Sequence, residues 1–149
     1  MSNVKIPAII VSGKTAQMGE SLSAIRQFVT TASQQAGLDK QAMYRLILAV
    51  DEIATNIFSY GYKDGHPDPK INIHALITDD GLTVTLEDFS AEFDPTSHQV
   101  KDELENDLDE RTIGGLGVYL ALSNVDSFTY ERVDGRNCNN FTMKRQKLG

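Results

Sequence analysis

Hydrophobic residues recur along this chain with different spacings, and the spacing separates strands from helices. The run from Val4 to Val11 is rich in isoleucine and valine, which predicts a strand that ends at Ser12-Gly13. From Glu20 to Ala36 the apolar residues recur at helical spacing. Gly37 follows directly, and a glycine in this place is typical of a helix end. The first part of the chain is therefore expected to be a strand followed by a helix.

A second helix carries the most informative pattern in the sequence. Asp39 is expected to cap its N-terminus, because an aspartate side chain there accepts hydrogen bonds from free backbone N–H groups. The helix is expected to end at Tyr60-Gly61-Tyr62, since the turn-forming residues Asp64 to Pro67 follow. Its broad apolar stripe consists of Met43, Leu46, Ile47, Val50, Ile53, Ala54 and Ile57.

The remaining chain is predicted to form two β-hairpins with a long loop and a short helix between them. Apolar and polar residues alternate in the first hairpin, as they do in a half-buried strand. Residues 94 to 113 show no regular pattern, and a loop of this length in a compact domain is typically a lid or disordered. The predicted segments are strands at 70–78 and 82–88 joined by Asp79-Asp80-Gly81, a helix at 118–124 opened by Gly114-Gly115-Leu116-Gly117, and strands at 127–133 and 138–145 joined by Asp134-Gly135.

The order of these segments predicts an α+β fold. A strand, two helices, a hairpin, a loop, a helix and a second hairpin form a two-layer α/β sandwich, with a mainly antiparallel mixed sheet and helices on one face. The chain has 149 residues, which is enough for one domain with a substantial core, and no repeat or linker divides it. We therefore expect a single domain over residues 1–149.

The formal net charge of −7 and the lack of a basic stripe argue against a nucleic-acid-binding protein. The acidic run from Asp102 to Glu110 is either a solvated loop or a segment that covers a ligand or a partner. No apolar run is long enough to cross a bilayer, and Met1 to Lys5 lack the layout of a secretory signal. Cys138 is the sole cysteine and is expected to be structural. Together these observations predict a cytoplasmic protein without nucleic-acid or membrane partners.

Glu52 and Asn56 are the first candidates for chemistry. They lie four residues apart on the second helix, so both side chains project from the same face. That face lies roughly opposite the apolar stripe, where polar residues usually meet water. Asparagine is a mediocre helix former, however, and a lysine or glutamine would suit a purely solvated position better. The pair is therefore open to either a functional or a solvating role.

Two further candidate motifs lie next to predicted loops. Gly114 to Gly117 precede a helix, and glycines there let the backbone and its free N–H groups approach a phosphate closely. A simple loop-to-helix turn is the alternative, and no Gly-Lys-Ser/Thr of a P-loop follows. Asp88 ends an apolar strand, where its carboxylate either forms a local turn or accepts a hydrogen bond from an exocyclic amine of a ligand.

Taken in order, the three elements resemble the motifs of the Bergerat-fold (GHKL, histidine-kinase-like) ATPases. Glu52 and Asn56 match the Glu-x-x-x-Asn N-box on its helix. Asp88 to Pro95 resembles the first glycine box, and Glu110 to Gly117 resembles the second. Within this superfamily the chain looks most like the serine kinases that act as bacterial anti-sigma factors. The resemblance extends over nearly the whole chain and implies the same two-layer fold.

The resemblance also implies a role for each motif residue. Asn56 would coordinate Mg²⁺, and Glu52 would either act as the general base or polarise the attacking hydroxyl. Asp88 would bind the adenine amino group of ATP, and residues between Pro95 and Ile113 would form the ATP lid. The residues implied in phosphate or nucleotide contact are Arg111, Gly115, Leu116 and Gly117. The reaction would be phosphoryl transfer to a serine of an anti-anti-sigma (STAS-type) protein, with a sigma factor as a further partner and a homodimer as the assembly.

Two alternatives stay open. Ser90 and Glu92 stand where the family usually has glycines, so the chain could be a non-catalytic binding module that sequesters a protein and binds nucleotide weakly or not at all. A histidine-kinase-like phosphate carrier is the other alternative. Against it, His66, His74 and His98 fall in a turn, a strand and a loop, and not on a dimerisation helix.

Overall fold

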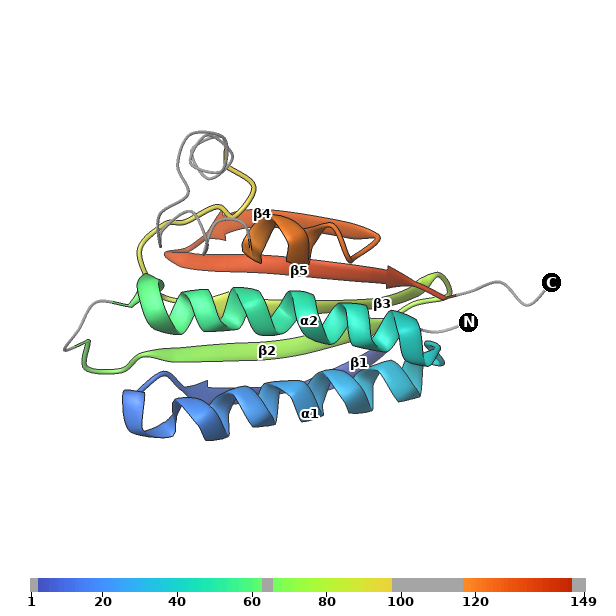
Figure 1. The fold of residues 1–149 in the computed structure, drawn as a ribbon, viewed down its shortest axis with the longest axis horizontal. Coiled ribbons are helices and arrows are strands. Elements are labelled where there is room, and N and C mark those ends of the chain that lie inside the picture. The colour runs from blue at the N-terminus through green and yellow to red at the C-terminus, as the bar shows by residue number, and fades with distance from the viewer. Residues whose placement is uncertain (1–2, 63–65, 98–116, 146–149) are drawn as a thin grey trace.

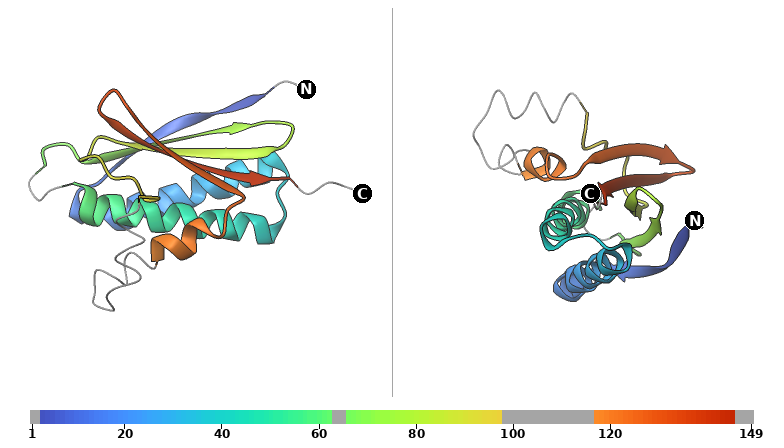
Figure 2. Two further views of the ribbon diagram at one scale, coloured as in Figure 1. Left: turned by 90° about the horizontal axis from the view of Figure 1, so that it is seen from above. Right: turned by 90° about the vertical axis from the view of Figure 1, so that its right-hand side faces the viewer.

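The computed structural model describes residues 3–62, 66–97 and 117–145, and it has two layers (Figures 1 and 2). Two long helices, α1 (Met18–Ala36) and α2 (Lys40–Asn56), lie side by side against one face of a five-stranded sheet. A short helix at 117–122 lies beside α2. The predicted two-layer α/β sandwich with helices on one face is confirmed.

The strand order is β1-β2-β3-β5-β4, so the second hairpin folds back and places its last strand beside β3. All four pairings are antiparallel, and the parallel pair that a mixed sheet requires does not occur among the described strands. The strands are β1 (Val4–Ser12), β2 (Lys70–Ile77), β3 (Gly81–Asp88), β4 (Ser127–Val133) and β5 (Arg136–Lys144).

Local sequence signals set the ends of the helices. Asp39 caps α2 through a hydrogen bond that its side chain accepts from the Ala42 backbone N–H at 2.7 Å. Gly37 ends α1 in the left-handed conformation with φ of 74°, and the Leu38 N–H then donates to the Ser33 carbonyl. Both predictions for the junction between the helices are therefore confirmed.

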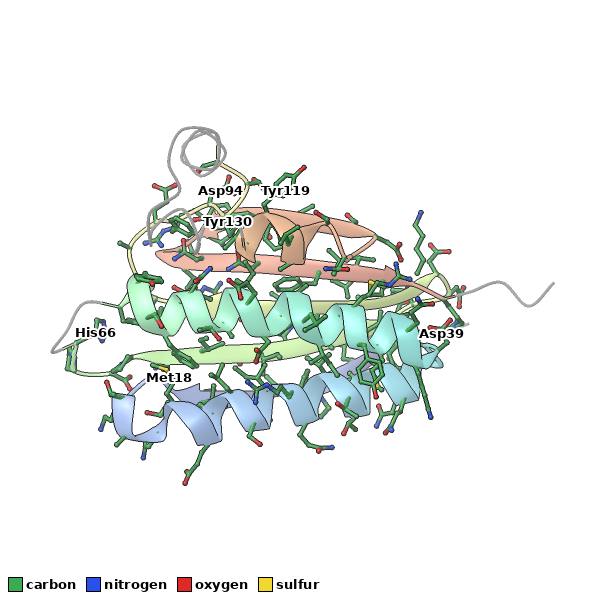
Figure 3. All side chains as sticks on the ribbon, viewed as in Figure 1. Met18, Asp39, His66, Asp94, Tyr119 and Tyr130 are labelled. Atoms are coloured by element: carbon green, nitrogen blue, oxygen red, sulfur yellow. The ribbon has the colours of Figure 1, made fainter. Side chains whose placement is uncertain are left out.

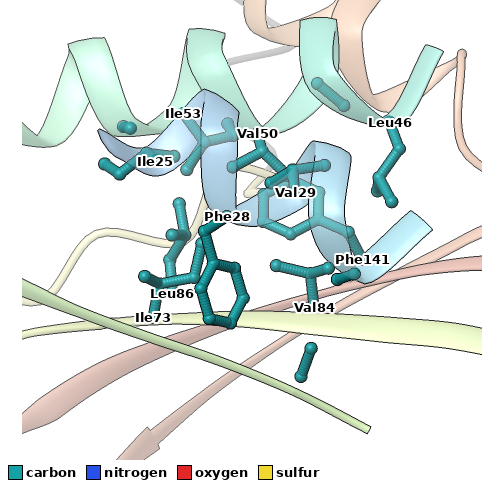
Figure 4. Packing of buried hydrophobic residues seen from close by; sticks show 14 of the residues in the cluster. Ile25, Phe28, Val29, Leu46, Val50, Ile53, Ile73, Val84, Leu86 and Phe141 are labelled. Carbon is teal, nitrogen blue, oxygen red and sulfur yellow. The ribbon is translucent and has the colours of Figure 1, made fainter. Parts of the chain in front are cut away.

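The core lies between the helices and the inner face of the sheet (Figure 4). Alternation along β2 buries one side chain in two, and β3 and β5 bury the positions that pair across from one another. The largest fully buried side chains include Ile25 and Val29 of α1, Leu46, Val50 and Ile53 of α2, and Ile73, Val84, Leu86 and Phe141 of the sheet. The apolar stripe predicted for α2 is thus the face that meets the sheet, which fixes the rotation of the helix and of its polar side.

The chain changes helix type directly after Asn56. Residues Ile57–Gly61 form a π-helical segment, labelled η2, that ends where the Tyr62 N–H donates to the Ile57 carbonyl at 3.3 Å. Single π-helical turns are rare and often occur at functional sites, because the wider turn displaces the backbone that follows. Here the segment brings Gly61 and Tyr62 against the end of β3.

Candidate functional site

Glu52 and Asn56 lie near the C-terminal end of α2, and Glu52 faces the start of the short helix at 117–122. Both side chains are half-buried, so the expectation of a simple solvated face opposite the core does not hold. Asn56 makes no side-chain hydrogen bond to any described residue, which leaves its amide oxygen available to a ligand. The two residues flank the buried stripe because a 100° step along the helix places them at its margin.

Gly117 is packed directly against Glu52. A Cβ atom built on this glycine would lie 2.9 Å from Cδ of Glu52, closer than real Cβ atoms approach a neighbour, and closer still to the carboxylate oxygen Oε1. The sequence separates these residues by more than sixty positions, yet the fold brings the second glycine box onto the N-box carboxylate. A side chain at residue 117 would therefore require the Glu52 carboxylate to move.

The pKa of the Glu52 carboxyl is raised above its ordinary value, chiefly because burial disfavours the charged form. The neighbouring Asp51 carboxylate adds to this rise by repulsion. Asp51 itself is held by Arg26, whose Nε donates to Asp51 Oδ1 at 2.8 Å across the two helices. A carboxylate with a raised pKa is a stronger base, so Glu52 is suited to accept a proton from a hydroxyl.

Asp88 lies at the end of β3 and is completely buried. Its Oδ1 accepts hydrogen bonds from the Ser90 backbone N–H at 3.0 Å and from Asn137 Nδ2 at 3.0 Å. The Ser90 hydroxyl also donates to Oδ1, at 2.5 Å. Its Oδ2 is equally buried and has no hydrogen-bond partner among the residues that the structure describes. An unpaired buried carboxylate oxygen is costly, and it is the feature expected of an acceptor that a ligand N–H will satisfy.

Asn137 holds this end of the sheet together. Besides Asp88, its Nδ2 donates to the Ala91 carbonyl at 3.0 Å, and its Oδ1 accepts from Tyr130 and Arg132. Arg132 also donates to the Ser90 carbonyl at 2.9 Å, so hydrogen bonds connect the segment after Asp88 to β4 and β5. Tyr130 of β4 is labelled in Figure 3. The network fixes Asp88 in one orientation. Its Oδ1 accepts hydrogen bonds from the protein, and its Oδ2 has no partner among the described residues.

Gly61 makes room for the serine in the first glycine box. A Cβ on Gly61 would lie 2.9 Å from Ser90 Oγ and 3.3 Å from Ser90 Cβ. Ser90 is buried and its hydroxyl turns back onto Asp88, while the side chain of Glu92 is exposed. The Ser90 hydroxyl is thus turned onto Asp88 Oδ1, and the Glu92 side chain points to solvent.

Tyr62, which directly follows η2, links the end of the second helix to β2 and β3. Its hydroxyl donates to the Lys70 carbonyl at 2.5 Å and accepts from the Phe89 backbone N–H at 2.9 Å. Burial raises the pKa of this tyrosine, and the hydroxyl is held protonated as a donor. The end of α2, the start of β2 and the end of β3 are thereby fixed relative to one another.

Comparison with known proteins agrees with this geometry. The family model of the histidine kinase-like ATPase domain matches residues 16–144 of the chain. The chain belongs to the histidine kinase-like ATPase family.

A solved structure of the same fold is the histidine kinase domain from Erythrobacter litoralis EL346 blue-light activated histidine kinase, with a TM-score of 0.51 and 15% sequence identity. The alignment covers 85% of this chain and 60% of that one, so the chain spans only part of the longer structure. At this identity the likeness shows the fold alone. No curated protein sequence matches the chain.

The residues of this histidine kinase-like ATPase domain fit a purine nucleotide. Asp88 Oδ2 is a buried acceptor without a partner, which an adenine amine would satisfy. The backbone of Gly117 lies beside the Glu52 carboxylate, at the start of the short helix. Among the described residues no group of three His, Cys, Asp or Glu is arranged to hold a metal ion. Mg²⁺ bound with nucleotide needs only one or two side-chain oxygens, because phosphates and water complete its shell, and Asn56 can provide one.

Some expected site residues fall outside the part of the chain that the structure describes. These are Arg111, Gly115 and Leu116, together with most of the segment expected to form the ATP lid and His98. Their roles stay predictions. Within the described residues, no helix is both long and apolar enough to cross a membrane.

Sequence reasoning did not find Asn137, Tyr62 or Gly61 as parts of this site. Asn137 stands in the final hairpin, and only the strand order places it opposite Asp88. Two asparagines pointing inward on an otherwise apolar strand face are the signal that could have revealed a polar site there, since buried amides need partners.

Proposed function

We propose that this chain is an ATP-dependent protein-serine kinase that acts as an anti-sigma factor in a bacterial partner-switching system. Its substrate would be a serine of a STAS-type anti-anti-sigma protein, and a sigma factor would be its second partner. The observation that carries the proposal is the contact of Gly117 with Glu52. It unites a phosphate-binding motif with a base, as phosphoryl transfer to a hydroxyl requires.

In this proposal Glu52 accepts the proton of the serine hydroxyl as its oxygen attacks the phosphorus. The raised pKa of the carboxyl favours that role, and its contact with Gly117 supports a position beside the backbone that would hold the phosphates. ATP bound with Mg²⁺ supplies the γ-phosphoryl group, and ADP is the leaving product. Asn56 would hold the metal ion and Asp88 the adenine, so catalysis consists mainly of positioning and charge stabilisation.

The described histidines do not favour a histidine phosphocarrier. His74 lies on β2, on the face of the sheet away from the helices, and its Nε2 is 3.3 Å from the Glu87 carboxylate. His66 is exposed in the loop before β2, where its Nδ1 accepts from the Asp68 N–H at 3.0 Å. Neither stands on a helix that could present it to a neighbouring kinase domain. A hydroxyl of a separate protein is therefore the better phosphoryl acceptor.

A homodimer is part of the proposal. The strand β1 lies at the edge of the sheet, and Ile10 on it is 67% exposed. An edge strand with unpaired backbone groups and apolar side chains is a surface on which a second chain can pair. Together with a STAS-type partner, the dimer would form the regulatory complex.

The experiment is phosphoryl transfer from γ-labelled ATP to purified STAS-type proteins of the source organism, each tested with wild type and with Glu52→Gln. The proposal expects label on a serine of one such protein and loss of most of the transfer with Glu52→Gln. Asn140→Ala serves as the control, because Asn140 lies on β5 with its side chain on the opposite face of the sheet. A serine phosphorylated equally well by Glu52→Gln would contradict the role of Glu52.

The second candidate is a non-catalytic binding module that sequesters a partner on the same fold. Ser90 and Glu92 in the first glycine box favour it, since glycines usually stand there. This candidate expects a partner complex that forms equally with wild type and Glu52→Gln and no transfer to any STAS-type protein. Labelled partner that disappears with Glu52→Gln would exclude it.

A further inference from the structure

The two ends of the candidate site lie in different layers of the fold. Asn56, which would hold Mg²⁺, is the last residue of α2, and Asp88, which would bind the adenine, is the last residue of β3. The reach of a nucleotide from its base to its phosphates is limited. Both ends can bind at once only when the fold holds Asn56 and Asp88 at a matching distance.

Tyr62 connects these two ends through one hydrogen bond. After Asn56 the chain continues as the five-residue segment η2 and then reaches Tyr62 directly. The Tyr62 hydroxyl accepts a hydrogen bond from the backbone N–H of Phe89, the residue after Asp88, at 2.9 Å. Among the described residues, no other hydrogen bond joins the segment 40–62 to the segment 86–90. The segment η2 and this hydrogen bond therefore form the direct link between the metal end and the base end.

The hydroxyl of Tyr62 is held in a fixed position. The residue is 8% exposed, and its hydroxyl also donates to the Lys70 carbonyl at 2.5 Å. Its ring meets the ring of His66, which is labelled in Figure 3, in an edge-to-face contact with the centroids 4.8 Å apart. Since the hydroxyl acts both as donor and as acceptor, its removal would leave two backbone groups without this partner and loosen the end of β3 from the end of η2.

The orientation of the Asp88 carboxylate is set by other residues than Tyr62. Its Oδ1 accepts hydrogen bonds from the Ser90 backbone N–H and from Asn137 Nδ2, each at 3.0 Å, and Asn137 belongs to β5. These bonds lie within the sheet and the segment that follows β3. Without the Tyr62 hydroxyl, the base end would therefore keep its own geometry while its distance from α2 is less well defined.

We propose that the hydroxyl of Tyr62 is a positioning group that sets the span between the base end and the phosphate end of the nucleotide site. The inference rests on the proposed function and assigns Tyr62 no contact with the nucleotide. A ligand that binds both ends gains affinity because its second contact is made within one complex, and this gain is largest when the two ends are held at the right distance. A ligand that binds only the base end has no such gain. Tyr62 should therefore matter for ADP with Mg²⁺ and not for adenosine.

The test is calorimetric binding of ADP with Mg²⁺ and of adenosine to the full chain, with wild type and Tyr62→Phe compared. Phenylalanine keeps the ring and removes only the hydroxyl. Wild type is expected to bind ADP with Mg²⁺ more tightly than adenosine. Tyr62→Phe is expected to reduce this affinity ratio by about three- to tenfold, the usual effect of one hydrogen bond, with adenosine binding unchanged. Tyr44→Phe is the matched control and should keep the ratio, because Tyr44 lies on α2 and is 60% exposed.

The affinity ratio distinguishes positioning from a loss of stability. Partial unfolding lowers the apparent affinities for both ligands by the same factor, so it leaves their ratio unchanged. A second pair of variants removes the donor in place of the acceptor, since Phe89→Pro has no backbone N–H and Phe89→Ala retains it. Proline suits this position because the residue before it, Asp88, is extended at the end of a strand. Phe89→Pro should lower the ratio relative to Phe89→Ala.

The outcomes separate this inference from the proposed function. If Tyr62→Phe and Phe89→Pro both keep the ratio, the hydroxyl does not set the span and only this inference is overturned. An equal loss for both ligands in Tyr62→Phe, with equal ratios in Phe89→Pro and Phe89→Ala, leaves Tyr62 a structural role and also overturns it. If wild type binds neither ligand, the proposed function fails and the inference fails with it. A ratio that falls in both Tyr62→Phe and Phe89→Pro, with adenosine binding retained, supports the inference.

Discussion

Gly117 and Glu52 lie in contact across the gap between the short helix and α2, so closely that any side chain at 117 would displace the carboxylate. A larger residue at 117 would therefore push the N-box carboxylate out of its present position. Activity should therefore depend on the size of residue 117 more than on its polarity.

Gly117→Ala is expected to lower the rate of phosphoryl transfer by about ten- to a hundredfold, since a shift of about 1 Å in a catalytic group has effects of that size. The matched control is Gly19→Ala in α1, where an added Cβ would meet nothing within 4 Å. That control should leave transfer unchanged and slightly raise stability, because alanine favours a helix. Equal transfer by Gly117→Ala and wild type would show that the contact does not matter for catalysis.

The pH dependence of transfer should report the environment of Glu52. A base must be deprotonated to act, so the rate is expected to rise with pH through the raised pKa of Glu52. Asp51→Asn removes one cause of the rise, and the acidic limb of the profile should then move to lower pH. The measurement is kcat/KM against pH for both proteins, and an unmoved limb would exclude Glu52 as the titrating base.

Glu52→Gln is expected to separate stability from activity. A carboxyl whose pKa is higher in the folded than in the unfolded chain binds protons more tightly when folded, so its contribution to stability falls as the pH rises between those two values. Glutamine has no such dependence. The unfolding temperature of the variant relative to wild type should therefore rise through this window by about a few degrees at most and then level off. Thermal unfolding from about pH 4 to about pH 8 tests this, and a relative stability that falls with pH would contradict it.

Gly61 and Ser90 should be coupled in a double-mutant cycle. Gly61→Ala introduces a Cβ 2.9 Å from Ser90 Oγ, and such overpacking costs about 1–3 kcal/mol of the free energy of unfolding. Ser90→Gly removes the clashing hydroxyl, so in that background Gly61→Ala should cost much less. Additive effects of the two changes in denaturant unfolding would show that Gly61 does not accommodate Ser90.

The sequence predicted the fold well because its local signals agree with one another. Asp39 and Gly37 are placed where a cap and a left-handed glycine are needed, and the alternation in 70–88 matches the hairpin that forms. The predicted strand boundaries differ by a residue or two, as at β5, which begins at Arg136 and not at Cys138. The second helix was expected to end at Tyr60 to Tyr62, whereas α2 ends at Asn56 and continues as the π-helical segment η2. The pairing of β5 with β3 is a long-range choice that local patterns do not encode.

The candidate site was predictable only where a motif marks it. Glu52, Asn56 and Asp88 were found from their spacing and from the family resemblance. Their burial was not predicted: Glu52 and Asn56 are half-buried, and Asp88 is buried. The absence of a side chain at Gly61 leaves space for Ser90, whose hydroxyl donates to Asp88. The fit between Gly61 and Ser90 depends on three-dimensional packing, which the sequence alone does not reveal.

The measurement that tests the account most directly is calorimetric binding of ADP with and without Mg²⁺, with wild type and Asn56→Ala compared. The account predicts that wild type binds ADP more tightly with Mg²⁺ and that Asn56→Ala loses most of this gain, while Asn140→Ala keeps it. Binding that is absent in wild type, or equally dependent on Mg²⁺ in Asn56→Ala, would contradict a metal–nucleotide site at the end of α2.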